Sequence, residues 1–129
     1  MAFDFDNPSF QAGREMRREL YGDAAIERLD ATDEFTEPLE DYATRAVFGE
    51  VWNRPGLTIR ERAFITIAIT AALNCKLPLE RQIMMAVNNG ATKDDIKEVL
   101  LHTTMYIGLA GGVESWKVAV DTLKAVGKY

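Results

Sequence analysis

The chain has 129 residues, a length typical of one domain that buries its own hydrophobic core. Its net charge of -5 argues against nucleic acid or an anionic membrane surface as a partner. A single histidine excludes a metal site with several histidine ligands in one chain, and a single cysteine excludes an internal disulfide. No apolar run is long enough to span a bilayer, and the acidic start does not resemble a secretion signal. We therefore predict one domain over residues 1–129, located in the reducing cytoplasm, with no bound metal.

The first part of the sequence predicts three helices. Residues 8–20 form an amphipathic segment of mixed charge that ends at Gly22, and residues 24–29 can add one or two further turns. Thr36 followed by Pro38 marks another helix start, because proline in the first turn loses no needed N–H group. Apolar residues then recur at steps of three and four, which indicates a helix with one apolar face: Leu39, Tyr42, Ala43, Ala46, Val47 and Val51.

The middle of the sequence predicts two more helices. Thr58 and Glu61 form a T-x-x-E capping box, in which each side chain satisfies the other residue's backbone N–H. The helix that follows is apolar nearly all round from residue 63 to residue 73, which is typical of the buried centre of a bundle. Pro78 is expected to open the next helix, and Asn89-Gly90 to close it.

The last third of the sequence completes an all-α bundle of about six helices. Thr92 and Asp95 form a second capping box, at the start of a helix whose apolar face reaches Ile107. Glycines at 108–112 predict a break before the last helix, and no segment alternates like a strand. Two helices are apolar on more than one face, and a chain this short cannot cover both easily. We therefore expect a homo-oligomer.

Several separate blocks of the sequence resemble γ-carboxymuconolactone (4-carboxymuconolactone) decarboxylases, and together they extend over almost the whole chain. The blocks are residues 13–23, 48–57, 88–101 and 106–114. The resemblance implies the all-helical alkylhydroperoxidase-D-like fold, assembled as trimers or hexamers with active sites near subunit contacts. It also implies a cofactor-free lyase that acts on a small carboxylated lactone or oxo acid in the catabolism of aromatic compounds.

The sequence departs from the peroxidase branch of the same superfamily, which carries a glutamate, a C-x-x-C pair and a histidine. Aligning Cys75 with the first cysteine places Pro78 at the second, Gln82 at the histidine and Ala63 at the glutamate. A dithiol cycle needs a second thiol to resolve its intermediate, and proline cannot supply one. We therefore expect no thiol peroxidase activity, and we interpret Cys75 as a buried apolar residue.

The sequence also departs from the decarboxylase branch, which carries a histidine at the position of Gln82. Glutamine hydrogen-bonds a carboxylate or a carbonyl, but it does not transfer protons near pH 7. Gln82 lies on the apolar stripe of its helix, so it is either a satisfied core residue or a residue that orients a ligand. The alternative to decarboxylation is therefore a repurposed member: another lyase, an isomerase, a hydrolase or a non-catalytic ligand binder.

Two further residues are candidates for proton transfer. His102 shares a helix face with Glu98 and Tyr106, so it is either a packing residue or a general acid that replaces the missing histidine. Glu61 is either the partner of Thr58 in the cap or an active-site acid.

The remaining candidates concern substrate binding. Arg60 and Arg62 lie near a helix start, and arginine grips a carboxylate through two parallel hydrogen bonds. Surface solvation or ion pairs between subunits explain both arginines equally well. Trp52 and Tyr106 are expected to form walls of a pocket for a flat lactone, or else to pack in the core.

Overall fold

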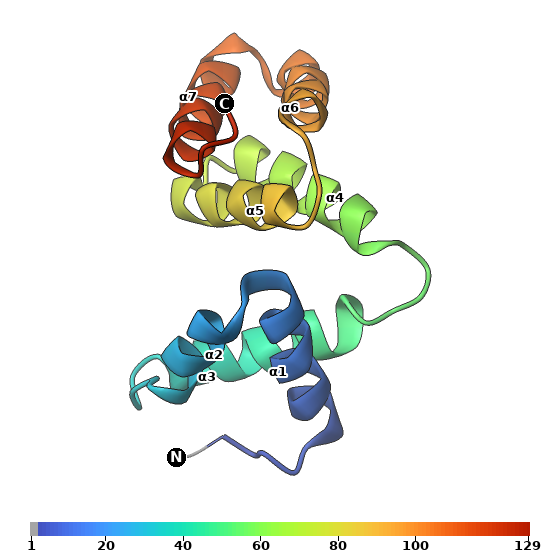
Figure 1. The fold of residues 1–129 in the computed structure, drawn as a ribbon, viewed down its shortest axis with the longest axis vertical. Helices are drawn as coiled ribbons and strands as arrows, with labels where there is room; N and C mark the ends of the chain where they lie inside the picture. The colour runs from blue at the N-terminus through green and yellow to red at the C-terminus, as the bar shows by residue number, and fades with distance from the viewer. Residues whose placement is uncertain (1–2) are drawn as a thin grey trace. The chain divides into compact units, whose positions relative to one another are not determined.

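The computed structural model describes residues 3–129, and the chain divides into two compact units, Met1–Leu57 and Thr58–Tyr129. The described residues form helices and no strand (Figure 1), which confirms the all-α prediction. The first unit contains α1 (Pro8–Tyr21), α2 (Asp23–Asp30), α3 (Glu37–Tyr42) and the π-helix η1 (Ala43–Val51). The second contains α4 (Ile59–Ala72), α5 (Lys76–Asn88), α6 (Lys93–Ile107) and α7 (Leu109–Ala125). The assignment of the whole chain to a single domain remains a prediction.

The first unit is built on the close packing of α1 against η1. A Cβ on Gly13 would overlap the backbone oxygen of Thr44, and a Cβ on Gly49 would overlap the backbone oxygen of Ser9. The two helices therefore approach each other at glycines on both sides. Arg17 links them further, since its Nη1 donates to Glu40 at 2.8 Å and to the Thr44 hydroxyl at 3.0 Å.

The helix predicted from Thr36 to Val51 is divided into an α-helical and a π-helical part. The π-helical hydrogen bonding is visible at its end, where the Trp52 N–H donates to the oxygen of Val47 at 2.9 Å. The spacing of apolar residues does not distinguish the i→i−4 hydrogen bonds of an α-helix from the i→i−5 bonds of a π-helix. The change from α3 to η1 could therefore not be predicted from the sequence. The apolar face is also less buried than expected, because Leu39 and Tyr42 are exposed.

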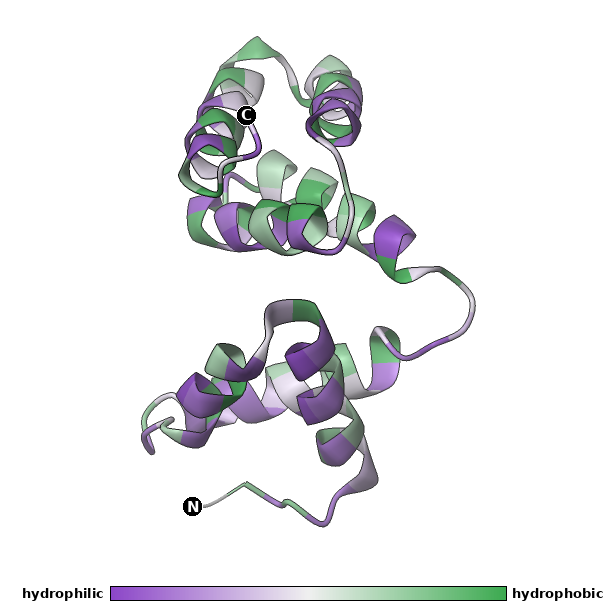
Figure 2. Ribbon diagram, in the orientation of Figure 1, coloured by the Kyte–Doolittle hydropathy of each residue, from purple (hydrophilic) through white to green (hydrophobic). Residues whose placement is uncertain are grey.

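In the second unit, α4 contacts α5, α6 and α7. It buries Ala63, Ile67 and Ala71, whereas Ile69 is half exposed at 50 % and Leu73 is 69 % exposed. Figure 2 shows α4 as hydrophobic beyond its charged first turn. The prediction of a buried central helix is therefore only partly right for the single chain, because one apolar side of α4 is uncovered.

Two predicted helix boundaries differ from the structure. Helix α5 begins at Lys76, not at Pro78, which is its third residue and still lies in the first turn, where no N–H is needed. Helix α7 begins directly after Gly108, whose φ of 94° makes the turn, so the predicted break at 108–112 is wrong beyond that residue. Gly112 is helical and buried, and a Cβ there would lie 2.5 Å from the side chain of Thr104. The glycine allows α6 and α7 to approach closely.

The expected core role of Cys75 is also not met, because this residue is only partly buried at the start of α5. No helix in residues 3–129 has both the length and the apolar character needed to cross a membrane.

Candidate active site

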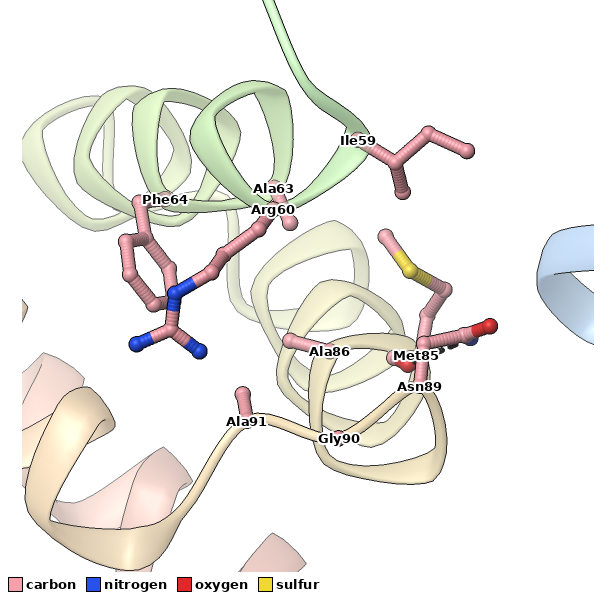
Figure 3. Close-up of a pocket in the computed structure, with 9 residues that line it drawn as sticks. All are labelled: Ile59, Arg60, Ala63, Phe64, Met85, Ala86, Asn89, Gly90 and Ala91. Atoms are coloured by element: carbon pink, nitrogen blue, oxygen red, sulfur yellow. Dashed lines mark hydrogen bonds between the residues drawn. The ribbon is translucent and has the colours of Figure 1, made fainter.

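A cavity of about 300 Å³ lies within the second unit, between the start of α4 and the end of α5 (Figure 3). Its α4 wall contains Arg60 and Phe64, and its α5 wall contains Met85. The full lining is Ile59, Arg60, Ala63, Phe64, Met85, Ala86, Asn89, Gly90 and Ala91. This size suits a small metabolite, and the apolar walls with few polar groups are typical of ligand sites.

Arg60 is the charged residue of this cavity, and its neighbours determine where its guanidinium lies. Its Cζ is 4.6 Å from the centroid of the Phe64 ring, a cation–π contact visible as the side-by-side arrangement in Figure 3. Its Nη2 is 2.8 Å from Oδ1 of Asp95 on α6. This interaction with Arg60, together with the backbone N–H of Thr92, lowers the pKa of Asp95 from 3.8 to about 2. Asp95 is therefore a charged partner of Arg60 at every physiological pH.

The far wall of the cavity is the end of α5 and the turn that follows it. Asn89 is the C-terminal cap of α5, and its Nδ2 donates to the oxygen of Met85 at 2.8 Å. Gly90 has a φ of 106°, so the left-handed turn after the helix favours glycine there. The sequence marked Asn89-Gly90 only as a helix end, with no sign that these residues line a cavity.

Gln82 is buried, with 6 % of its surface exposed, which agrees with the predicted inward position. It lies three and four residues before Met85 and Ala86, so it occupies the same side of α5 as the cavity wall, one turn earlier. Gln82 is not itself among the residues that line the cavity. It is thus close to the site along the helix without forming part of its surface.

His102 lines a second hollow, a groove of about 440 Å³ between α4 and α6. Glu98 and Asp95 lie in the same groove, and its floor is apolar, with Phe64 common to the groove and the cavity. The rings of His102 and Tyr106 stack with centroids 5.3 Å apart. Glu98, His102 and Tyr106 are all exposed in this chain, which agrees with the predicted common face of α6.

The other predicted site residues are not among those that line the cavity. Glu61 takes part in the cap of α4: its N–H donates to the Thr58 hydroxyl, and its carboxylate accepts from that hydroxyl at 3.0 Å. Arg62 is two residues from Arg60 and therefore faces another direction on α4. Trp52 belongs to the first unit, where it is buried and packs on Phe48 with ring centroids 5.7 Å apart. Of the predicted residues, only Arg60 lines the cavity.

Within residues 3–129, no group of three or more His, Cys, Asp and Glu side chains is arranged to hold a metal ion. The polar groups at the cavity are a paired guanidinium, an amide and the backbone of a turn. Such groups bind and orient an anion or a carbonyl, and they do not transfer protons near neutral pH.

Residues 37–121 match the carboxymuconolactone decarboxylase family, and this match covers more than half of the chain. The chain belongs to this family. It is 33 % identical over 123 residues to the 4-carboxymuconolactone decarboxylase of Acinetobacter baylyi, with 95 % of this chain and 92 % of the relative covered. It is 30 % identical over 115 residues to the nitrosuccinic acid decarboxylase of Metarhizium robertsii, with 88 % of this chain and 80 % of the relative covered.

These matches confirm the resemblance of the sequence blocks to carboxymuconolactone decarboxylases. Both carry decarboxylase names, and they support a decarboxylase-like lyase in general for this family member. The two named substrates differ, one being a lactone and the other a nitro acid.

Proposed function

We propose that this protein is a cofactor-free lyase that removes carbon dioxide from a small carboxylated lactone or oxo acid, in the catabolism of aromatic compounds. The observation that carries the proposal is the cavity beside Arg60, which combines one oriented guanidinium with apolar walls in a member of a decarboxylase family. The substrate that we propose is a small acid with two carboxylates. Arg60 binds the carboxylate that stays, and the leaving carboxylate lies against the apolar side.

The reaction needs no oxidant or metal in this scheme. The bond between the leaving carboxylate and its carbon breaks, and the electron pair moves into a conjugated carbonyl or a comparable acceptor group. Hydrogen-bond donors that are already in place stabilise the enolate that forms. Arg60 donates to the substrate carboxylate at the cavity surface. Gln82, which lies one turn earlier on α5 and outside the cavity lining, is the candidate donor to the enolate that the family resemblance indicates. Carbon dioxide leaves as the bond to the leaving carboxylate breaks, and a proton then adds to the carbon of the enolate.

His102 is our candidate for the source of that proton, directly or through a water molecule. It is the only histidine of the chain, and imidazole is the side chain that most often acts as a general acid. Its groove and the cavity share Phe64. Glu61 remains a secondary candidate for the acid, and Arg62 for a hydrogen-bond donor to the substrate carboxylate. Trp52 and Tyr106 remain candidates for contacts with the substrate.

The second candidate function is a repurposed pocket, and Gln82 is the observation that favours it. A buried glutamine occupies the position at which the family resemblance expects a histidine. In this alternative the pocket binds oxo acids or lactones without releasing carbon dioxide, as another lyase, an isomerase, a hydrolase or a non-catalytic binder.

We also propose that the protein acts as a homo-oligomer, a trimer or a hexamer, in the cytoplasm. Its support is the apolar surface of the second unit, where large hydrophobic side chains on three helices are exposed: Ile65, Ile69, Leu73, Met105, Leu109 and Val113. Large exposed apolar areas on a folded protein often mark interaction sites.

The proposal is tested with 4-carboxymuconolactone as substrate and Arg60→Gln as the variant. Release of carbon dioxide by the native protein, and a fall in kcat/KM of tenfold or more in Arg60→Gln, would support the carboxylate-binding role of the cavity. Arg81→Gln is the matched control, because Arg81 is an exposed arginine of α5 that does not line the cavity. Saturable binding of the lactone without release of carbon dioxide would instead favour the repurposed pocket.

A further inference from the structure

Asp95 links the start of α6 to the arginine of the cavity. Its Oδ2 accepts from the backbone N–H of Thr92 at 2.8 Å, and its own N–H donates to the Thr92 hydroxyl at 3.1 Å. These bonds form the capping box that the sequence predicted. The other oxygen, Oδ1, lies 2.8 Å from Nη2 of Arg60 on α4. One oxygen of the Asp95 carboxylate thus caps α6, and the other pairs with Arg60 of α4.

The capping hydrogen bonds fix the position of the Asp95 carboxylate, and the carboxylate in turn restrains the Arg60 side chain. Arginine loses considerable rotamer entropy when it is ordered, and the Arg60 side chain is 54 % exposed. Without a partner, its guanidinium would sample several positions at the mouth of the cavity. The ion pair with Asp95 and the cation–π contact with the Phe64 ring both restrain it. The geometry of a bound carboxylate depends directly on the position of the guanidinium.

We propose that Asp95 is a positioning residue, which holds the Arg60 guanidinium so that its remaining N–H groups meet the carboxylate of the substrate. The inference rests on the proposed function for the identity of the substrate, but the holding of Arg60 is independent of it. Asp95 does not line the cavity itself, so it acts through Arg60.

The charge of Asp95 determines which kinetic parameter responds. A negative partner beside Arg60 reduces the net attraction that the guanidinium exerts on a second carboxylate. Removal of the partner therefore leaves ground-state binding as strong as before, or stronger, while the guanidinium loses its fixed orientation. Misplacement of a positioning group by about 1 Å lowers rates by up to about 10²-fold. The expected signature is a lower kcat without a higher KM.

The experiment compares Asp95→Asn with Asp94→Asn in the turnover of 4-carboxymuconolactone. The amide of the Asp95→Asn variant would keep an oxygen for the Thr92 N–H, so the cap survives while the charged pair is lost. Asp94 lies in the same turn and pairs with Lys97, not with Arg60. Asp94→Asn is therefore a control that changes the net charge by the same amount. We expect kcat to fall about tenfold or more in Asp95→Asn with KM unchanged or lower, and both to stay within twofold of native in Asp94→Asn. A kcat for Asp95→Asn within twofold of the control would overturn the proposal.

The Arg60 side chain offers a readout that does not need turnover. In the native protein and in Asp94→Asn, NMR should resolve separate guanidinium signals for Arg60, because the ion pair slows its rotation. In Asp95→Asn these signals should merge into those of a free arginine. Unchanged signals would show that Asp95 does not hold Arg60, whatever the activity. If the signals merge but the native protein does not release carbon dioxide, Asp95 holds Arg60 and the proposed function is the part that fails.

Discussion

Gly13 of α1 lies so close to the backbone carbonyl of Thr44 in η1 that no side chain fits between them. Gly49 repeats the relationship from the other side, against the backbone of Ser9. The packing of α1 against η1 therefore depends on glycine at positions 13 and 49, where a side chain would overlap the other helix.

Replacement of Gly13 by alanine should destabilise the protein by about 1–3 kcal/mol or more, because the added Cβ forces α1 away from η1. Gly56→Ala is the control, since a Cβ at Gly56 meets nothing within 4 Å. The control should change the free energy of unfolding by no more than about 0.5 kcal/mol. Urea unfolding of both variants measures the difference. Equal stabilities would show that the two helices are not packed as described.

The ion pair of Asp95 should make stability depend on pH under acidic conditions. The pKa of Asp95 is lowered to about 2 in the folded protein, chiefly by Arg60, and is near 3.8 when the chain is unfolded. The contribution is therefore complete above about pH 4 and is lost as the pH falls through about 2. Asp95→Asn should show a shallower loss of stability than the native protein between these values.

Glu114 makes a separate contribution to the same experiment, because its pairing with Lys76 lowers its pKa. Glu114→Gln should remove its own part of the acid dependence and leave the part due to Asp95. Urea unfolding from pH 7 to pH 2 measures both. Parallel curves for the native protein and Asp95→Asn would contradict the assigned pair.

His102→Gln should lower kcat for 4-carboxymuconolactone by about 10²-fold or more if His102 supplies the proton, since general acids contribute factors of this size. Glutamine keeps the polarity and approximate size of the side chain but cannot transfer the proton. Lys97→Gln is the control, because Lys97 is exposed on the same helix and does not line the groove. Steady-state kinetics measure kcat for both variants. A native kcat in His102→Gln would show that His102 is not the proton donor.

Ile69→Asp should shift the protein towards smaller assemblies. Ile69 is 50 % exposed on the uncovered side of α4, and a charge there cannot be buried against another copy without a large cost. Arg81→Asp introduces the same side chain at an already charged and exposed position, and it should leave the assembly unchanged. Sedimentation velocity of the native protein and both variants gives the masses. A monomeric native protein would contradict the proposed oligomer.

The elements of the fold could be predicted from the sequence where local chemistry decides them. The Thr92–Asp95 capping box forms as predicted, because its hydrogen bonds involve residues three apart. The Thr58–Glu61 pair is also in contact, although its bonds run from the Glu61 N–H to the Thr58 hydroxyl and from that hydroxyl to the Glu61 carboxylate. The π-helical η1 escaped prediction because five-residue hydrogen bonding leaves no mark in apolar spacing.

The candidate site could be predicted only in part, because it depends on contacts between distant residues. The chemistry of arginine makes Arg60 a candidate from the sequence, but its partner Asp95 lies 35 positions away, and only the fold brings them together. The capping box predicts a role for one oxygen of Asp95 and says nothing about the other. Asn89 and Gly90 likewise signalled a helix end, and their place in the cavity wall follows from the packing of α4 on α5.

The most direct test of decarboxylation is time-resolved proton NMR of the purified protein with 4-carboxymuconolactone, beside the Gln82→His variant. We predict that the native protein forms the enol-lactone at an enzymatic rate, well above the rate without protein. Turnover by Gln82→His alone would show that the pocket persists but that the native chain performs another reaction. No enol-lactone from either protein would contradict the account of this chain as a carboxymuconolactone decarboxylase.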